Sequence, residues 1–327
     1  MTGRTQSAGE FDLLASWRER LGSGRDGETY AGDDTAVLHS PPNGARLLLT
    51  TDLLAEGVHF DLSLGTLQDA GWKAVVANAS DIAAMGGRLL HAVAAVAGPG
   101  RAGLDELFAG MVEAGERFGV DLVGGDLSSS ERWFVAVAMT GTCDERRPVL
   151  RGGAAAGERI FVTGPLGGSA AGLARLREAR APAARSKAAF EPARPASPGS
   201  AEDLTAAYLR PSARVPEGIA AARLGATAMI DVSDGLRGDL GHICEASGVG
   251  FRLSSVPVAP GADEAMALSG GEDYELVFAT REGADVGAAF SAAGLRCPIE
   301  IGVLVGDASE RSLRGEQLPE SGFEHRF

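Results

Sequence analysis

The chain has 327 residues, a formal net charge of −14, and 45% hydrophobic and 23% charged residues. This length is sufficient for two domains of ordinary size, and the composition is that of a soluble globular protein. The acidic balance argues against nucleic acid as a partner, because binding a phosphate backbone requires a basic face. No apolar run reaches the roughly 18–20 residues that span a bilayer, so we expect no membrane association.

The first 30 residues are polar and charged, and they lack the hydrophobic segment of a secretory signal. The three cysteines, Cys143, Cys244 and Cys297, lie far apart and have no metal-ligand spacing. They are expected to be reduced, partly buried thiols in a cytoplasmic protein.

The hydrophobic pattern alternates between strands and helices in two successive halves. In the first half we expect strands at 45–51, 88–97, 120–123 and 133–141, and helices at 67–85 and 104–118. In the second half we expect strands at 159–163, 227–232, 251–253, 274–280 and 299–305, and helices at 168–178 and 236–246.

This pattern predicts two α/β domains, residues 1–147 and 148–327, with acidic residues at the strand ends where open α/β sheets bind ligands. Residues 179–201 are mostly Ala, Pro, Arg and Ser. Such a segment buries too little apolar surface to order itself, so it is interpreted as a mobile surface insertion.

Aspartates recur at the turns that follow the apolar runs and in the Gly-, Ser- and Thr-rich breaks between the predicted strands and helices. They occur in Asp33-Asp34, Thr50-Thr51-Asp52, Ser80-Asp81, Gly124-Gly125-Asp126 and Asp231-Val232-Ser233-Asp234-Gly235. Each one alone is equally well explained as a turn or a helix cap. Carboxylates gathered by a fold repel one another unless hard cations lie between them, and Mg²⁺ bound to phosphate oxygens is the usual occupant. The set therefore indicates a Mg²⁺–nucleotide enzyme, although the chain has no Walker A sequence.

Two of these segments, and one further acidic segment, indicate more specific chemistry. Asp81 interrupts an apolar helix and needs a partner, for which a cation is the best candidate. The turn at 231–235 places two carboxylates around a hydroxyl, with backbone amides that can face anions. The acids of Gly270-Gly271-Glu272-Asp273-Tyr274-Glu275 are not expected to serve a core, whereas His59 by its pattern alone is an ordinary satisfied polar residue.

Taken in order, these motifs resemble those of the thiamine-monophosphate kinase family. The matching segments include Gly32-Asp33-Asp34, Glu56-Gly57-Val58-His59-Phe60, residues 78–86, Gly124-Gly125-Asp126, residues 231–236, residues 268–275 and Gly322-Phe323-Glu324-His325. The resemblance implies the two-domain fold of the aminoimidazole ribonucleotide synthetase superfamily. In that fold, the N-terminal domain pairs in a homodimer to form a β-barrel and the C-terminal domain is α/β.

The resemblance also implies roles for particular positions. Several Mg²⁺ ions would be held by Asp34, Thr50, Thr51, Asp52, Asp81, Asp126, Asp231 and Asp234. ATP would contact Gly125, Asp126, Arg151 and Ser233. Thiamine monophosphate would contact His59, Glu272 and Phe323. Residues 127–129 depart from the family pattern, as does Tyr208, which stands where the family often has His.

The implied reaction is direct transfer of the ATP γ-phosphoryl group to thiamine monophosphate, giving thiamine diphosphate. The attacking phosphate oxygen is already ionised, so no catalytic residue is expected beyond the metal cluster. Two alternatives remain open at this stage. The first is another ATP-using enzyme of the superfamily, although no cysteine lies near either end of the chain; the second is a non-catalytic nucleotide-binding regulator.

Overall fold

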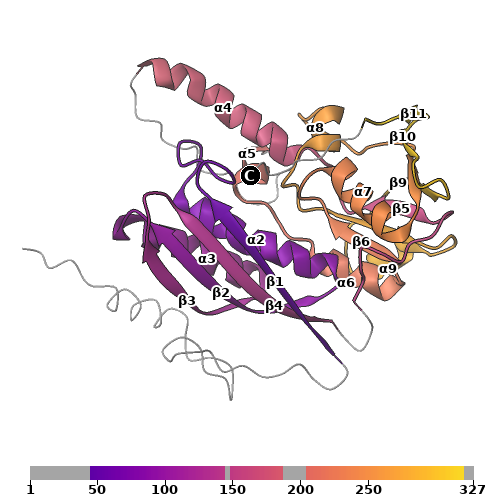
Figure 1. Ribbon diagram of the computed structural model, residues 1–327, viewed down its shortest axis with the longest axis horizontal. Coiled ribbons are helices and arrows are strands. Elements are labelled where there is room, and N and C mark those ends of the chain that lie inside the picture. Colours follow the sequence, from indigo (N-terminus) through magenta and orange to yellow (C-terminus); the bar gives the residue numbers. More distant parts are fainter. Residues whose placement is uncertain (1–44, 144–147, 187–203, 320–327) are drawn as a thin grey trace, which may run out of the picture.

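The computed structural model describes residues 45–143, 148–186 and 204–319, with side chains omitted for 181–186. Asp34 and Phe323 lie outside these residues. The described chain forms two open sheets flanked by helices (Figure 1). All strands up to Cys143 belong to one sheet, and all strands from Arg159 onward belong to the other.

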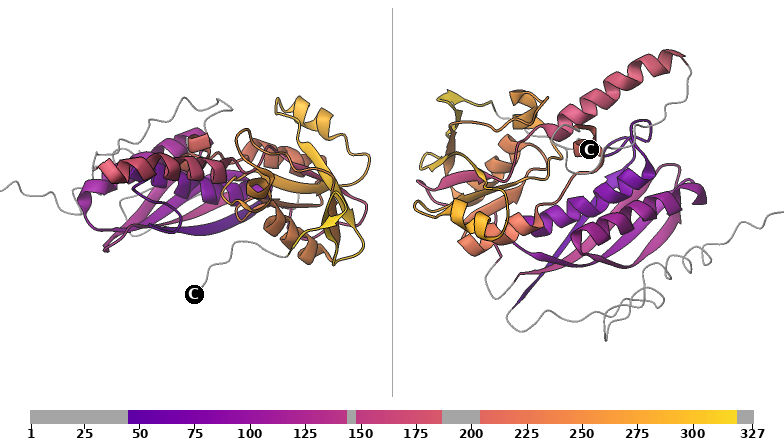
Figure 2. Two further views of the ribbon diagram at one scale, coloured as in Figure 1. Left: turned by 90° about the horizontal axis from the view of Figure 1, so that it is seen from above. Right: turned by 180° about the vertical axis from the view of Figure 1, so that it is seen from behind.

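The N-terminal sheet has four strands in the order β1-β4-β2-β3. They are β1 (Arg46–Ala55), β2 (Arg88–Gly98), β3 (Asp121–Ser129) and β4 (Phe134–Cys143). Strand β4 is antiparallel to both β1 and β2, whereas β3 is parallel to β2. Helices α2 (Leu67–Ala84) and α3 (Leu104–Phe118) cover one face of this sheet, and the short 3₁₀ helix η1 (Arg101–Gly103) precedes α3 (Figure 2).

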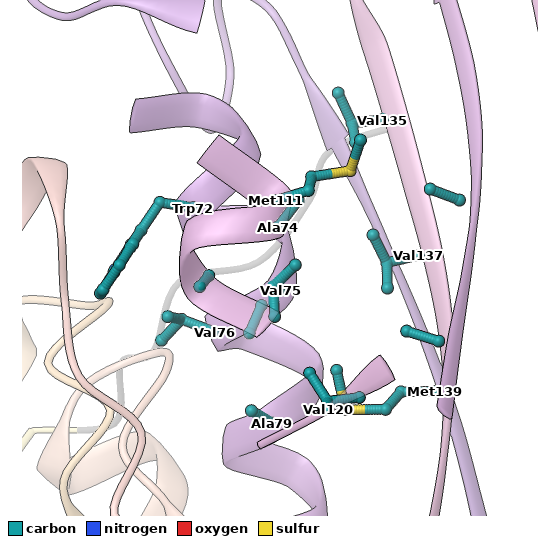
Figure 3. Packing of buried hydrophobic residues seen from close by; sticks show 14 of the residues in the cluster. Trp72, Ala74, Val75, Val76, Ala79, Met111, Val120, Val135, Val137 and Met139 are labelled. Atoms are coloured by element: carbon teal, nitrogen blue, oxygen red, sulfur yellow. The ribbon is translucent and has the colours of Figure 1, made fainter. Parts of the chain in front are cut away.

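Helix α2 is the central element of the molecule. Its first turn is closed by a capping box, in which Thr66 and Asp69 each accept a hydrogen bond from the other's backbone N–H. A Cβ atom on Gly110 of α3 would lie 1.8 Å from the Gln68 carbonyl oxygen, so glycine is what allows the two helices to approach so closely. Trp72, Val75 and Val76 of α2 belong to the same buried cluster as Val135, Val137 and Met139 of β4; Val75 points toward β4, whereas Trp72 and Val76 point away from it (Figure 3).

The C-terminal sheet has seven strands in the order β11-β10-β7-β9-β5-β8-β6. They are β5 (Arg159–Val162), β6 (Ala228–Asp231), β7 (Gly250–Leu253), β8 (Leu276–Thr280), β9 (Ile299–Val305), β10 (Arg311–Leu313) and β11 (Glu316–Gln317). Only the β7–β10 pairing is parallel. The helices of this half are α4 (Gly168–Ser186), α5 (Leu204–Leu209), α6 (Val215–Leu224), α7 (Leu236–Ser247), α8 (Glu264–Ser269) and α9 (Val286–Ala292).

The second half of the chain packs against α2. Trp72 donates its indole N–H to the Pro211 carbonyl oxygen at 2.8 Å. Arg210 pairs with Asp69 and with Glu113, each at 2.8 Å, and so ties the turn after α5 to both α2 and α3. A Cβ atom on Gly218 of α6 would lie 2.1 Å from a carbonyl oxygen near the end of α2. The junction between the two halves is therefore closely packed.

The structure differs from the sequence prediction at several element boundaries. Strand β1 continues to Ala55, which places Asp52 within the strand and not at its end. Strand β3 continues through Gly124-Gly125-Asp126 to Ser129, because pairing with β2 offsets the poor strand propensity of these residues. Helix α4 runs to Ser186 and takes in the start of the predicted insertion, whose residues 187–201 lie outside the described chain. Helices α5, α6, α8 and α9 and strands β10 and β11 were not predicted.

Two further expectations can be compared with the structure. All three cysteines are free thiols; Cys143 and Cys244 are buried and Cys297 is exposed. Over the described ranges, no helix is both long enough and apolar enough to cross a membrane.

Candidate functional site: an acidic cluster between the two domains

Three aspartates from both halves of the chain come together where α2 meets β6. Asp52 comes from the middle of β1, Asp81 from the last turn of α2, and Asp231 from the end of β6. Across the junction, the charges of Asp81 and Asp52 both raise the pKa of Asp231, and within the N-terminal half the charge of Asp81 raises the pKa of Asp52. The fold therefore gathers carboxylates that are up to 179 positions apart in the sequence (231 − 52).

Burial raises the pKa values of all three carboxylates, and the charge of a neighbouring aspartate adds to this for Asp52 and Asp231. Burial, followed by the charge of Asp81, raises the pKa of Asp52 to about 6. Burial, and then Asp81, raises the pKa of Asp231 to about 7. Burial also raises the pKa of Asp81, although its hydrogen bond from Thr50 and the nearby Arg151 act in the opposite direction. Such a group of carboxylates holds its negative charge at unfavourable energy, as expected of a site that receives a cation.

Neighbouring hydroxyls hold two of these carboxylates in place. The Ser80 hydroxyl donates to Asp231 Oδ2 at 2.7 Å, and both side chains are buried. The Thr50 hydroxyl donates to Asp81 Oδ2. Asn78 is fully buried, and its Oδ1 atom has no hydrogen-bond partner among the described residues.

The turn after β6 is shaped by Asp239, a residue that the sequence analysis did not single out. Its Oδ2 atom accepts hydrogen bonds from the backbone N–H groups of Ser233 at 3.1 Å and Asp234 at 3.0 Å. Burial, and then the charge of Asp231, raises the pKa of Asp239 to about 8. These two amides therefore have a partner within the chain, which corrects the expectation that they face an anion. A carboxylate in the first turn of a helix is the signal that could have identified Asp239.

The acids of the 270–275 loop have different roles, and two of them are structural. Asp273 accepts hydrogen bonds from the backbone N–H groups of Gly167 at 2.6 Å and Ser169 at 3.1 Å, at the start of α4. Glu275 forms a two-point ion pair with Arg214, at 2.6 and 3.0 Å. Glu275 is buried, so the expectation that the acids of this loop do not serve a core is wrong for Glu275.

Glu272 is the third acid of this loop, and it turns toward α2. Its backbone lies in the left-handed region (φ 63°), which is uncommon for a residue other than glycine. Its N–H donates to the Ser233 carbonyl oxygen at 2.8 Å, so this loop packs on the turn that follows β6. Its Oε2 atom accepts a hydrogen bond from Lys73 of α2 at 2.9 Å.

His59 lies on the other side of the same lysine. The His59 carbonyl oxygen accepts a hydrogen bond from Lys73 Nζ at 3.3 Å, and its Nδ1 atom accepts one from the Ala55 N–H at 3.0 Å. The second bond places the proton of the neutral imidazole on Nε2. His59 and Glu272, the two described positions with an expected substrate role, are thus joined through one side chain.

Thr51 and Asp126 do not join the cluster within one chain. Leu53 of β1 pairs with Ala136 of β4, which pairs with Ala95 of β2, which in turn pairs with Asp126 of β3. Paired residues share a face of the sheet, as do residues two apart on one strand. Asp126 therefore lies on the same face as Leu53 and Thr51, which is the outer face, away from α2. Strands β1 and β3 form opposite edges of the sheet, and the three strand spacings between them amount to roughly 14 Å. Asp126 is exposed, as is Gly125 beside it.

The same outer face carries exposed apolar side chains. Leu47, Leu49 and Leu53 of β1 are 58%, 73% and 54% exposed, and Val93 and Phe134 are 39% and 37% exposed. Monomeric proteins rarely leave so many large apolar side chains together in water. Most of one face of the N-terminal sheet is therefore suited to contact another protein surface.

The chemistry of the inner cluster fits a divalent cation with oxygen ligands. Asp52, Asp81 and Asp231 supply carboxylates, and Thr50 lies beside them. Among the described residues, however, no three His, Cys, Asp or Glu side chains are close enough to enclose one ion. Mg²⁺ is usually held by one or two carboxylates together with water and substrate phosphates, so this spacing suits Mg²⁺ bound along with a phosphate ligand.

The amino-acid sequence is similar to known protein families and to named enzymes. Family models described as AIR synthase related protein, N-terminal and C-terminal domain, match residues 32–143 and 155–313. The thiamine-monophosphate kinase of Mycobacterium tuberculosis is 38% identical over 292 residues, covering 83% of this chain and 80% of the relative. That of Salmonella typhimurium is 36% identical over 294 residues, covering 84% of each.

Solved structures give the same result for the fold. The thiamine-monophosphate kinase of Stenotrophomonas maltophilia superposes with a TM-score of 0.80 at 30% identity, covering 94% of this chain and 98% of the other. The complex of AaThiL with AMPPCP and TMP has a TM-score of 0.73 at 30% identity, with 99% of each chain covered. Escherichia coli HypE, at 18% identity and a TM-score of 0.70, shares the fold alone. The chain belongs to the thiamine-monophosphate kinase family.

Proposed function

We propose that the protein transfers the γ-phosphoryl group of ATP to the phosphate of thiamine monophosphate, forming thiamine diphosphate. The observation that carries the proposal is the convergence of Asp52, Asp81 and Asp231 at the domain junction, where burial raises all three pKa values and repulsion from Asp81 raises those of Asp52 and Asp231 further. Named relatives at 36–38% identity support the substrate, and so does the AaThiL complex with the ATP analogue AMPPCP and TMP.

The chain's own residues would divide into two groups. Asp52, Asp81 and Asp231, with Thr50 and Asp234 beside them, would hold Mg²⁺. When bound, Mg²⁺ neutralises the phosphates and aligns the attacking oxygen with the bond that breaks. Arg151 lies close enough to Asp81 to affect its pKa, and it would contact the ATP phosphates together with Ser233. His59 and Glu272 would bind the organic part of thiamine monophosphate.

No residue needs to act as a general base, because the attacking phosphate oxygen is ionised at neutral pH. The contribution of the protein is then to position two anions and to offset their repulsion. The other enzymes of the superfamily are less favoured as an assignment, because the likeness to HypE extends only to the fold. A non-catalytic role is also less favoured, because the carboxylates of the inner cluster are all present.

The direct test is to incubate the protein with ATP, Mg²⁺ and thiamine monophosphate and to measure thiamine diphosphate by chromatography. The Asp231→Asn variant should reduce the rate by about 10²–10³, the size of effect seen when one electrostatic stabiliser is lost. Asp307→Asn, which changes an exposed carboxylate away from the cluster, is the matched control. An Asp231→Asn variant that folds and turns over at the wild-type rate would contradict the metal assignment.

We also propose that two copies of the chain pair through the outer face of the N-terminal sheet and form a β-barrel. The apolar side chains on β1 support this pairing, and so does the position of Asp126 on the same face. In such a dimer, Asp126 and Gly125 of one copy could complete the site of the other, next to Thr51. Light scattering should then give the mass of a dimer, and Leu49→Arg should give a monomer. A monomeric wild-type protein would rule this pairing out.

A further inference from the structure

Lys73 is the buried charge at the centre of the expected substrate side of the site. Its side chain is only 3% exposed, although lysine is almost always a surface residue. Its ammonium group lies 2.9 Å from Glu272 Oε2, 3.3 Å from the His59 carbonyl oxygen and 3.8 Å from the centroid of the Tyr208 ring. One side chain of α2 thus connects three other segments of the chain.

Keeping a charge in this place is unfavourable unless its partners are well placed. Burial lowers the pKa of Lys73, and the charges of Glu272 and then Asp69 act in the opposite direction. The face of the Tyr208 ring adds a cation–π contact to the ammonium group. The roles proposed above do not account for this arrangement, because they give Lys73 no contact with ATP or with a metal ion.

Glu272 differs from its neighbour Glu275 in a way that points to a ligand. Glu275 is 5% exposed, and both of its oxygens pair with Arg214. Glu272 is 25% exposed and uses only Oε2 for Lys73, and its Oε1 atom has no hydrogen bond to another described residue. A carboxylate fixed at one oxygen and open at the other is suited to accept a hydrogen bond from a bound molecule.

We propose that Lys73 is a positioning residue: it fixes Glu272 against the His59 segment, so that the second carboxylate oxygen of Glu272 faces the cationic, amine-bearing organic part of the substrate. This inference rests on the proposed function, which supplies thiamine monophosphate as the ligand. Lys73 acts through Glu272 and does not touch the substrate. Its role therefore concerns substrate binding and leaves the binding of Mg²⁺–ATP unchanged.

A double-mutant cycle tests this role. Lys73→Met and Glu272→Gln should each raise the KM for thiamine monophosphate by about ten- to a hundredfold, the effect of losing one hydrogen bond to a charged group. The Kd of AMPPCP with Mg²⁺ should stay within about twofold. The combined variant Lys73→Met/Glu272→Gln should have the same KM as Glu272→Gln alone, because Lys73 has nothing left to position.

The combined variant also guards against a folding failure. Lys73→Met alone leaves a carboxylate without its buried counter-charge, whereas the combined variant removes both charges together. Arg214→Met is the matched control, since it breaks the neighbouring ion pair to Glu275; it should lower the melting temperature and leave the KM for thiamine monophosphate within about twofold.

Two results would overturn the proposal. If Lys73→Met raises the KM further in the Glu272→Gln background, Lys73 does not act through Glu272. If Lys73→Met lowers only the melting temperature, as Arg214→Met does, the pair is merely structural. The wild-type protein separates this inference from the proposed function: if it makes no thiamine diphosphate, the proposed function fails, whereas an active wild type with either of these results refutes only the role of Lys73.

Discussion

If Asp126 enters the site from a second copy of the chain, a mixed dimer of the Asp52→Asn and Asp126→Asn variants should be active, although each variant alone is inactive. Within one chain, Asp126 lies on the outer face of β3, while Asp52 lies on β1 and faces α2. Three strand spacings of roughly 4.8 Å separate their strands, so these two carboxylates cannot share one metal–phosphate site within a chain. Asp52→Asn and Asp126→Asn should each be nearly inactive as pure proteins.

The expected magnitude follows from the two-fold symmetry of the proposed dimer. In a mixed dimer of the two variants, one site contains both substitutions, Asp52→Asn from one chain and Asp126→Asn from the other, and is inactive. The other site combines the two unaltered residues and is intact. Purified mixed dimers should therefore have about half the wild-type activity per chain. If each site were built from a single chain, both sites of the mixed dimer would be damaged and no activity would return.

The assay is co-expression of the two variants with different affinity tags, purification over both tags, and measurement of thiamine diphosphate formation. The matched control is the mixed dimer of Asp52→Asn with Asp231→Asn. Both of these residues contribute to the inner cluster of the same chain, so this dimer should stay inactive. Recovery in the control, or none in the test pair, would refute the shared site.

Three further predictions concern the cluster and its supports. The raised pKa values of Asp52 and Asp231, about 6 and about 7, mean that the folded state binds protons that the unfolded chain has already lost. Without metal, the free energy of unfolding that these groups contribute should therefore fall as the pH rises from about 4 through 7. The rise in melting temperature caused by Mg²⁺ should be larger at pH 8 than at pH 5.5, as measured by calorimetry. Asp239→Ala should weaken binding of Mg²⁺–AMPPCP in titration calorimetry, whereas Asp239→Asn keeps an acceptor oxygen for the two amides and should bind nearly normally. Gly110→Ala should lower the free energy of unfolding in urea by about 1–3 kcal/mol through overpacking against α2, and an unchanged value would contradict the close helix contact.

The strongly periodic elements could be predicted from the sequence alone. Helix α3 and strand β9 have the predicted bounds, because the apolar residues of α3 recur at helical spacing and β9 is rich in Ile and Val, which favour strands. Strand β1 was predicted too short because a carboxylate in mid-strand looks like a strand end, although Asp52 lies in the cluster beside α2. Propensity cannot identify a polar residue that the tertiary structure requires.

The site was only partly predictable, for a similar reason. Asp52, Asp81 and Asp231 could be identified from their positions at element breaks. That Asp126 lies apart from them depends on the strand order and on which face of the sheet each side chain occupies, and no local sequence pattern encodes either. Lys73 was overlooked because a helical lysine is usually solvated. Its neighbours Gly71-Trp72 and Ala74-Val75-Val76 were the available signal, since a charge within an apolar helix needs a buried partner.

Helix α2 relates the two sides of the site to each other. Lys73, which contacts Glu272, and Ser80, which contacts Asp231, are seven residues apart and so lie on the same face of the helix. At 1.5 Å per residue, this spacing sets them about 10.5 Å apart along the axis. The helix is buried between the sheet and the C-terminal domain, so it cannot bend or rotate without breaking both packing surfaces. The distance from the organic part of the substrate to the metal cluster is therefore set by a rigid element, and a loop cannot set the position of a phosphate as closely.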